Sequence, residues 1–162
     1  EISECLVGSE MCIRDSISGV HAFEIKEFNR IVVPVKKALT SFIDAEDIGE
    51  ITAKVLSEPE KHKNKGYSIT GGEAIDYNEV AKILSEELGR EITYANLKPS
   101  LAKQYWIQIR GLDKEYSTVM EMLYMMTRMG TAKKVTTVYK DIMNKEPQTF
   151  RQFVRKNIKS WI

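Results

Sequence analysis

The spacing of apolar residues along the chain predicts helices and strands in alternation. Apolar residues recur at helical spacing over 45–56 and 76–88, and an aspartate stands at or beside the start of each stretch. Three stretches rich in β-branched and aromatic residues, 30–35, 66–70 and 91–97, indicate short strands around these helices. Because parallel strands need a crossover connection, this order predicts an α/β fold with about three short strands.

From residue 100 onward the pattern predicts helices alone. Glycine or proline interrupts the apolar spacing between them. The predicted helices span 100–109, 114–129, 136–144 and 149–162. We therefore expect a helix-rich C-terminal lobe after the strands. The sequence has no window of about 18 apolar residues, so we expect no membrane span.

The helix predicted at 45–56 is the element around which we expect the later elements to pack. Asp44 or Asp47 can cap its start. Further acidic residues crowd its first turns, and capping and solvation explain them without a catalytic role. The apolar face of this helix is formed by Ile48, Ile51, Val55 and Leu56.

Composition and charge narrow the possible partners. The chain has 162 residues, of which 43% are hydrophobic and 29% charged, as expected for a single globular domain. The net charge of +1 hides an asymmetry, since residues 98–162 hold 13 basic and 5 acidic residues. These cations are spread over helical positions instead of forming a cluster. We therefore expect solvated helix faces and no nucleic-acid partner.

Several motifs resemble one family of proteins. Residues 41–48, S-F-I-D-A-E-D-I, are similar to the signature S-F-I-D-V-R-D-I-A of the NmrA-like, atypical short-chain dehydrogenases/reductases. Residues 66–74, G-Y-S-I-T-G-G-E-A, resemble the family pattern A-Y-x-L-T-G-P-E-A, with Gly72 where proline is usual. The helix after them and residues 149–154 continue the likeness, which covers about 42–161.

The resemblance implies an NAD(P)H-dependent oxidoreductase with a Rossmann-like fold, acting on a small organic acceptor of the quinone or carbonyl type in the cytoplasm. In that family the dinucleotide, NADP or NAD, binds to the half that precedes these motifs. No G-x-G-x-x-G motif occurs in this sequence, so we expect residues 17–162 to be the C-terminal, substrate-side half. Alone, this half is expected to bind no dinucleotide and to be inactive.

Two other functions stay open. The same family contains redox-sensing regulators that bind NAD(P) without turning it over, and the residues that distinguish them would lie in the dinucleotide-binding half. A free-standing helical interaction module is the third possibility, and it requires that residues 1–16 be a genuine part of the protein.

Residues 1–16 have a different character from the rest. They hold both cysteines, Cys5 and Cys12, which lack the further ligands of a metal site. Residues 6–16, L-V-G-S-E-M-C-I-R-D-S, resemble the translation of a sequencing adapter. We expect 1–16 to be a non-native tail.

Candidate site residues lie where strands were expected to end. In open α/β sheets ligands bind outside the carboxyl ends of the strands, so Thr40, Ser41 and Phe42 are predicted to line the substrate pocket. Gly71 and Gly72 follow a strand, as a phosphate-binding loop does. The third glycine is absent, and a turn that needs a positive φ explains the pair more simply.

Other candidates are weaker. Tyr94 and Lys98 have the Y-x-x-x-K spacing of classical short-chain dehydrogenases, but on a strand they lie about 13 Å apart, at roughly 3.3 Å per residue, too far to act together. His21 and His62 have no partner at metal-ligand spacing, and His62 is expected in solvent. Five methionines in 114–129 are predicted to fill the core or, alternatively, to form a flexible apolar wall over the substrate pocket. They are Met120, Met122, Met125, Met126 and Met129.

Overall fold

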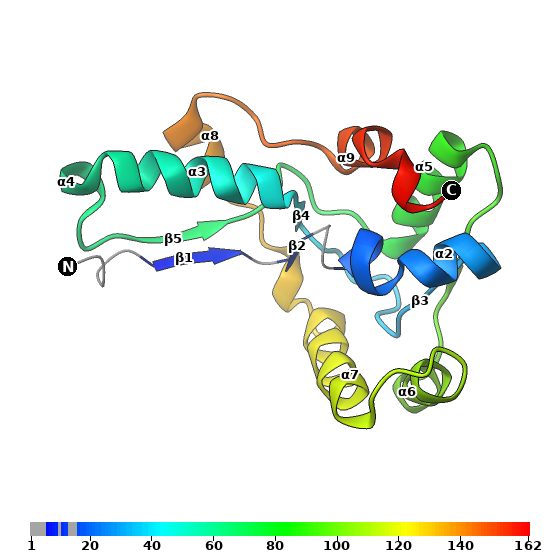
Figure 1. The fold of residues 1–162 in the computed structure, drawn as a ribbon. Helices are drawn as coiled ribbons and strands as arrows, with labels where there is room; N and C mark the ends of the chain where they lie inside the picture. Colours follow the sequence, from blue (N-terminus) through cyan, green and yellow to red (C-terminus); the bar gives the residue numbers. More distant parts are fainter. Residues whose placement is uncertain (1–5, 10, 13–15) are drawn as a thin grey trace.

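The computed structural model describes residues 6–9, 11–12 and 16–162 (Figure 1). The described strands form three parallel pairs, β1 with β5, β2 with β4 and β3 with β6. An isolated antiparallel bridge joins Thr40 to Ile75. The strands are β1 (Leu6–Ser9), β2 (Met11–Cys12), β3 (Arg30–Val32), β4 (Phe42–Ile43), β5 (Gly66–Ile69) and β6 (Thr93–Ala95).

Helices make up most of the described chain, which confirms the predicted α/β fold with short strands and a helix-rich C-terminal part. The α-helices are α2 (Ala22–Phe28), α3 (Ala45–Ser57), α4 (Pro59–His62), α5 (Tyr77–Leu88), α6 (Pro99–Gln108), α7 (Lys114–Arg128), α8 (Val138–Met143) and α9 (Phe150–Lys156). Three short segments complete the set: a π-helix η1 (Ser16–Val20) and the 3₁₀ helices η2 (Thr131–Lys133) and η3 (Ile158–Ser160). No described helix has the length and apolarity to cross a bilayer.

Local signals in the sequence set most helix ends. Asp44 caps α3 by accepting from the Glu46 N–H, and Asp76 caps α5 by accepting from two backbone N–H groups. Thr149 begins α9 in a capping box with Gln152. The helix predicted over 149–162 is shorter than expected, because α9 ends at Lys156 and a 3₁₀ turn follows.

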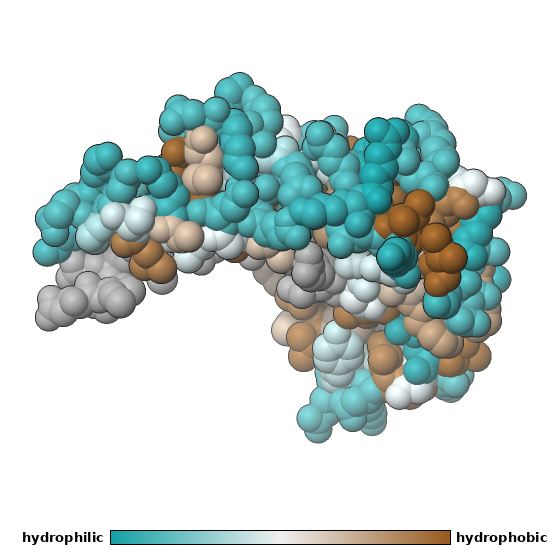
Figure 2. Space-filling model, turned by 45° about the horizontal axis from the view of Figure 1, so that its top comes forward, coloured by the Kyte–Doolittle hydropathy of each residue, from teal (hydrophilic) through white to brown (hydrophobic). Residues whose placement is uncertain are grey.

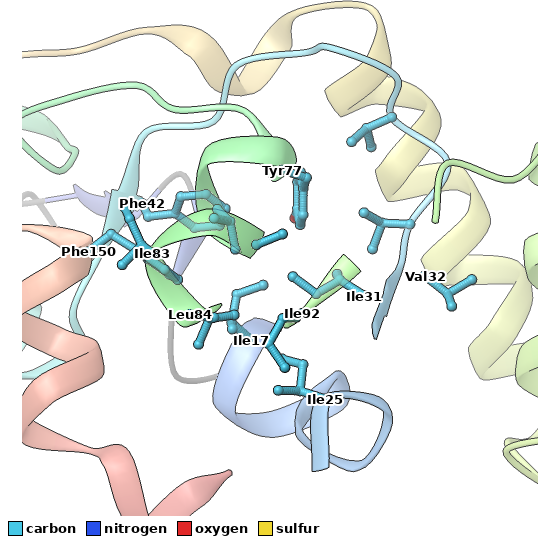
Figure 3. Packing of buried hydrophobic residues seen from close by; sticks show 14 of the residues in the cluster. Ile17, Ile25, Ile31, Val32, Phe42, Tyr77, Ile83, Leu84, Ile92 and Phe150 are labelled. Carbon is cyan, nitrogen blue, oxygen red and sulfur yellow. The ribbon is translucent and has the colours of Figure 1, made fainter. Parts of the chain in front are cut away.

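The larger hydrophobic core surrounds α5. Figure 3 shows Ile83 and Leu84 of α5 among Ile31, Phe42 and Phe150, which come from β3, β4 and α9. Helix α3 instead covers a smaller cluster, made by Ile43, Ile51, Val55, Ile69 and Tyr139. The expectation that later elements pack around 45–56 is therefore wrong.

Helix α3 lies in an arm of the molecule that extends away from the larger core. It lies beside β5 and α8 in this arm, which explains why only one side of the helix is covered (Figure 1). Leu56, which was placed on the apolar face, is 55% exposed. The surface over the arm is mostly hydrophilic, and the underside of the molecule is hollowed between the arm and the lobe that carries α7 (Figure 2).

Gly71 is required for close backbone packing and not for its φ angle. A Cβ atom at this position would lie 1.8 Å from the carbonyl oxygen of Phe42. Neither Gly71 nor Gly72 has a positive φ, so the expected left-handed turn is wrong. Because the chain touches Phe42 there, the end of β5 is held against the start of β4.

His62 is buried, so its expected position in solvent is wrong. Its ring is 9% exposed, and Nδ1 lies 2.7 Å from the hydroxyl of Tyr67. The imidazole ring also packs edge-on against the Tyr67 ring, at 5.6 Å between centroids. A turn separates Tyr67 from His62, so the apolar spacing within a single helix or strand could not reveal this contact.

The two cores give a matched pair of leucine substitutions. We expect Leu84→Ala, at a fully buried site in α5, to lower the free energy of unfolding by about 2–5 kcal/mol through lost apolar contacts and a residual cavity. Leu56→Ala, at an exposed site in α3, should change it by about 0.5 kcal/mol or less. Urea denaturation followed by circular dichroism measures both values. Equal losses would contradict the division of the core.

Gly71 and Gly72 form a second matched pair. The Cβ of Gly71→Ala would overlap the Phe42 carbonyl, so we expect a loss of at least about 2 kcal/mol in unfolding free energy. At Gly72 the Cβ would lie 3.5 Å from Pro147 Cγ, an ordinary contact, and Gly72→Ala should stay within about 1 kcal/mol of the parent. The same denaturation experiment applies, and an unaffected Gly71→Ala protein would refute the close approach.

Candidate functional site

A cavity of about 240 Å³ lies just past the carboxyl end of β5. One wall is the segment that follows β5, and the opposite wall is the connection between α8 and α9 with the first residue of α9. The lining consists of Phe42, Gly72, Glu73, Ile75, Glu146, Pro147, Gln148, Thr149 and Phe150. Its position agrees with the general rule for ligand sites in open α/β sheets.

Aromatic rings form the apolar side of the cavity. The rings of Phe42 and Phe150 lie 5.4 Å apart between centroids, tilted by 45°. The Phe42 ring also meets Tyr77 edge-on at 5.7 Å. Figure 3 shows Phe42 and Phe150 next to each other, close to Ile83. Because all these side chains are buried in the core, the aromatic wall is rigidly supported.

A buried acid holds the opposite wall. The N–H of Gln148 donates to Asp47 Oδ2 at 2.8 Å, and the Tyr139 hydroxyl lies 3.0 Å from Asp47 Oδ1 and 2.8 Å from Glu50 Oε2. Burial raises the pKa of Asp47, whereas the hydrogen bond with Lys145 lowers the pKa of Glu50. The Tyr139 hydroxyl, which has a single proton, thus lies within hydrogen-bond distance of two carboxylates.

Capping and solvation explain the acidic cluster at the start of α3, as expected, except at Asp47, which is buried. Asp44 and Asp47 are 0% and 3% exposed, and their roles are capping and anchoring. Glu46 and Glu50 are exposed and pair with Lys156 and with Lys145 respectively. The sequence alone could not separate the two groups, because Tyr139 and Gln148 lie about 90–100 residues away from them.

The three predicted pocket residues have different positions. Phe42 lines the cavity. Thr40 and Ser41 are fully buried, and the Ser41 N–H and hydroxyl both donate to the Ala132 carbonyl, at 2.9 Å and 3.2 Å. The expectation that they end a strand is wrong, because β4 begins at Phe42. Contact of Thr40 and Ser41 with a substrate stays a prediction.

The methionines of α7 do not fill the core as a group. Met120 is 5% exposed, but the other four are between 37% and 73% exposed. Core filling is therefore wrong for Met122, Met125, Met126 and Met129. Their exposure leaves the alternative, an apolar wall over a substrate pocket, as a prediction.

Tyr94 and Lys98 do not form a catalytic pair. Tyr94 lies in β6, and its hydroxyl donates to the Lys36 carbonyl at 3.0 Å. Burial raises the pKa of Tyr94 to about 12, whereas a catalytic phenol needs a lowered pKa.

A buried polar network, which the sequence did not indicate, joins the start of α2 to α7 and to the segment that follows α6. His21 lies between Glu24 and Tyr124, with Nδ1 2.8 Å from Glu24 Oε2 and Nε2 2.5 Å from the Tyr124 hydroxyl. Arg110 donates to the other Glu24 oxygen at 2.8 Å. His21 therefore satisfies a buried carboxylate, and no cluster of metal-ligating side chains occurs in the part of the chain described here.

The loop after β5 does not have the geometry of a phosphate-binding turn. A pyrophosphate needs free backbone N–H groups on a glycine-rich turn at a helix start. The backbone at Gly71 is packed against Phe42 instead. Seven residues also separate the end of β5 from the start of α5, so the loop does not lead directly into a helix start. Sequence reasoning also missed the cavity wall at 146–148, for which the helix-breaking Pro147 was the only signal.

Comparison with known proteins shows one family. A model described as the NmrA-like family matches residues 23–154. The agroclavine dehydrogenase of Claviceps fusiformis is 31% identical over 139 residues, which are 85% of this chain and 47% of that protein. The NAD(P)H azoreductase of Xenophilus azovorans is 27% identical and covers 84% of this chain and 47% of its own length.

Solved structures share the fold. An NADPH-dependent quinone oxidoreductase from Escherichia coli, complexed with NADPH, superposes with a TM-score of 0.87 at 16% identity, over 95% of this chain and 53% of that one. A triphenylmethane reductase from Citrobacter sp. gives a TM-score of 0.78 at 20% identity, over 88% and 48%. The chain thus spans about half the length of the proteins it matches. From the match over 23–154 and the order of its motifs, the chain belongs to the NmrA-like family.

Proposed function

We propose that this chain forms the acceptor-binding side of an NAD(P)H-dependent reductase for a small organic molecule of the quinone or carbonyl type. The observation that carries the proposal is the cavity beyond β5, in a chain of the NmrA-like family. The names of several relatives, an azoreductase and dehydrogenases among them, support the reaction class.

The chemistry of the lining suits a planar organic acceptor. Phe42, Ile75 and Phe150 give the cavity an apolar lining, and an apolar lining excludes water from a bound molecule. Hydride transfer is favoured when donor and acceptor are held in one orientation. The role of these residues is therefore to bind and orient the acceptor.

In this proposal a separate half binds the dinucleotide. The sequence contains no G-x-G-x-x-G, and the chain spans about half the length of its relatives. The hollow between the α3 arm and the α7 lobe is a suitable place for the other half (Figure 2). If residues 1–16 are a non-native tail, β1 and β2 take places beside β5 and β4 that native strands of that half would fill.

One observation favours the second candidate, a redox-sensing regulator that binds dinucleotide without turnover. Reduction of a quinone or carbonyl needs a proton as well as a hydride. The lining includes no tyrosine, histidine or lysine to donate that proton. A regulator needs no such donor, whereas a reductase must obtain it from outside the lining.

The two functions differ in turnover. We expect the 162-residue chain alone neither to bind NADPH saturably below about 1 mM nor to oxidise it. A longer protein, assembled from independently sequenced upstream DNA, should oxidise NADPH with members of a quinone and carbonyl panel. Spectrophotometry at 340 nm measures the oxidation. Saturable dinucleotide binding without turnover on any panel member would favour the regulator, and tight NADPH binding by the 162 residues would refute the division into halves.

Phe42 tests whether the cavity holds the acceptor. In the longer protein we expect Phe42→Leu, which keeps the core apolar, to raise the KM for the acceptor about tenfold and to leave the KM for NADPH unchanged. Leu56→Ala, an exposed site on α3, is the control and should change neither value. An unchanged acceptor KM in a folded Phe42→Leu protein would exclude the cavity as the acceptor site.

A further inference from the structure

We infer that the cavity beyond β5 selects a small aromatic ligand that carries a positive charge, such as a ring bearing a protonated alkylamine. The inference depends on the proposed function in one respect, namely that it identifies the acceptor of that reaction as a cation of this class. Binding of such a cation by this chain follows from the charges, apolar lining and size of the cavity itself.

The charged residues of the lining are both acidic. Glu146 forms an ion pair with Lys140 of α8. Glu73 is exposed at the cavity and has no hydrogen-bond or ion-pair partner among the described residues. The lining therefore presents one carboxylate whose charge no neighbouring side chain offsets.

Cations near the cavity are already paired with other acids. Lys145, next to Glu146, lies 2.6 Å from Glu50. Arg155, in the open depression that adjoins the cavity, lies 2.8 Å from Glu87. Lys156 in the same depression pairs with Glu46. Since these positive charges are balanced, the uncompensated charge at the cavity is the negative charge of Glu73.

Apolar side chains complete the lining. Phe42 and Phe150 are 3% and 2% exposed, so they offer a ligand apolar contact and leave no ring face open to a cation. The size also limits the ligand, because an apolar cavity of about 150 Å³ holds benzene. A cavity of about 240 Å³ therefore admits one ring with a short side chain.

Gly72 keeps the cavity open. A Cβ atom there would lie 3.5 Å from Pro147 Cγ on the opposite wall, so a longer side chain would extend across the cavity. The backbone at Gly72 has no positive φ, and a substitution does not strain it. Gly72→Leu is thus expected to fill the cavity while leaving the two cores intact.

The test uses three probes that differ in charge and share a ring. They are 2-phenylethylamine, which is protonated at pH 7, neutral 2-phenylethanol and anionic 3-phenylpropionate. Ligand-observed NMR titration of the 162-residue chain at about 10 mM ionic strength limits screening of the exposed carboxylate. We expect a Kd of roughly 0.1–1 mM for the amine, in line with a ligand of this size. The alcohol should bind about 2- to 5-fold more weakly, and the anion more weakly again.

Variants assign the effect to residues. Glu73→Gln should abolish the preference for amine over alcohol, and Glu73→Lys should reverse it in favour of the anion. Gly72→Leu should abolish binding of all three probes. Glu91→Gln, an exposed carboxylate outside the lining, is the matched control and should leave every Kd unchanged. A circular dichroism melt of each variant confirms that it is folded, and intermolecular NOEs from the amine should reach the Phe42 and Phe150 ring protons.

Each possible result either supports or overturns the inference. Equal binding of amine and alcohol, binding that persists in folded Gly72→Leu protein, or NOEs to other residues would overturn the inference. These measurements need no dinucleotide, so their failure leaves the proposed reductase standing. Conversely, failure of NADPH oxidation in the longer protein leaves the cation preference intact.

Discussion

The close approach of Gly71 to Phe42 is the contact on which the arrangement of this chain depends. Beyond β5 the backbone passes so near to Phe42 that even a methyl group at Gly71 would overlap its carbonyl oxygen. Phe42 belongs to the larger core and the next residue, Ile43, belongs to the smaller one. Because β5 is held against the junction of these two residues, the contact fixes the α3 arm relative to the helices around α5. The cavity forms at the same junction.

Neither wall of the cavity is regular secondary structure, so each depends on an anchor. The Gly71 contact anchors the wall after β5. On the other side the anchor is the hydrogen bond from Gln148 to Asp47, together with the Thr149 cap of α9. Burying the Asp47 carboxyl is unfavourable, and its raised pKa reflects that cost. This unfavourable burial occurs where Asp47 connects the loop between α8 and α9 to helix α3, about 100 residues earlier in the sequence.

Local chemistry was predictable from the sequence, and contacts between distant segments were not. Asp44, Asp76 and Thr149 cap helices as their residue types and positions indicate, because an N-cap acts within three residues of itself. The burial of His62 depends on a partner five residues away, beyond a turn. The role of Gly71 depends on a strand about 30 residues earlier. Periodicity carries no information on either contact. Phe42 lines the cavity although it begins a strand instead of ending one, and its contact with a substrate stays a prediction.

The surface of α7 bears on the proposed second half. Leu123 and three methionines of this helix are exposed, as is Met129, which directly follows it, at 37–73%. Exposed apolar residues are ordinary when they are scattered, but the hydration of five within eight residues is unfavourable. A dinucleotide-binding half placed in the hollow beside α7 would cover these methionines. The flexibility of methionine suits such a boundary, because unbranched side chains can adapt to acceptors of different shape.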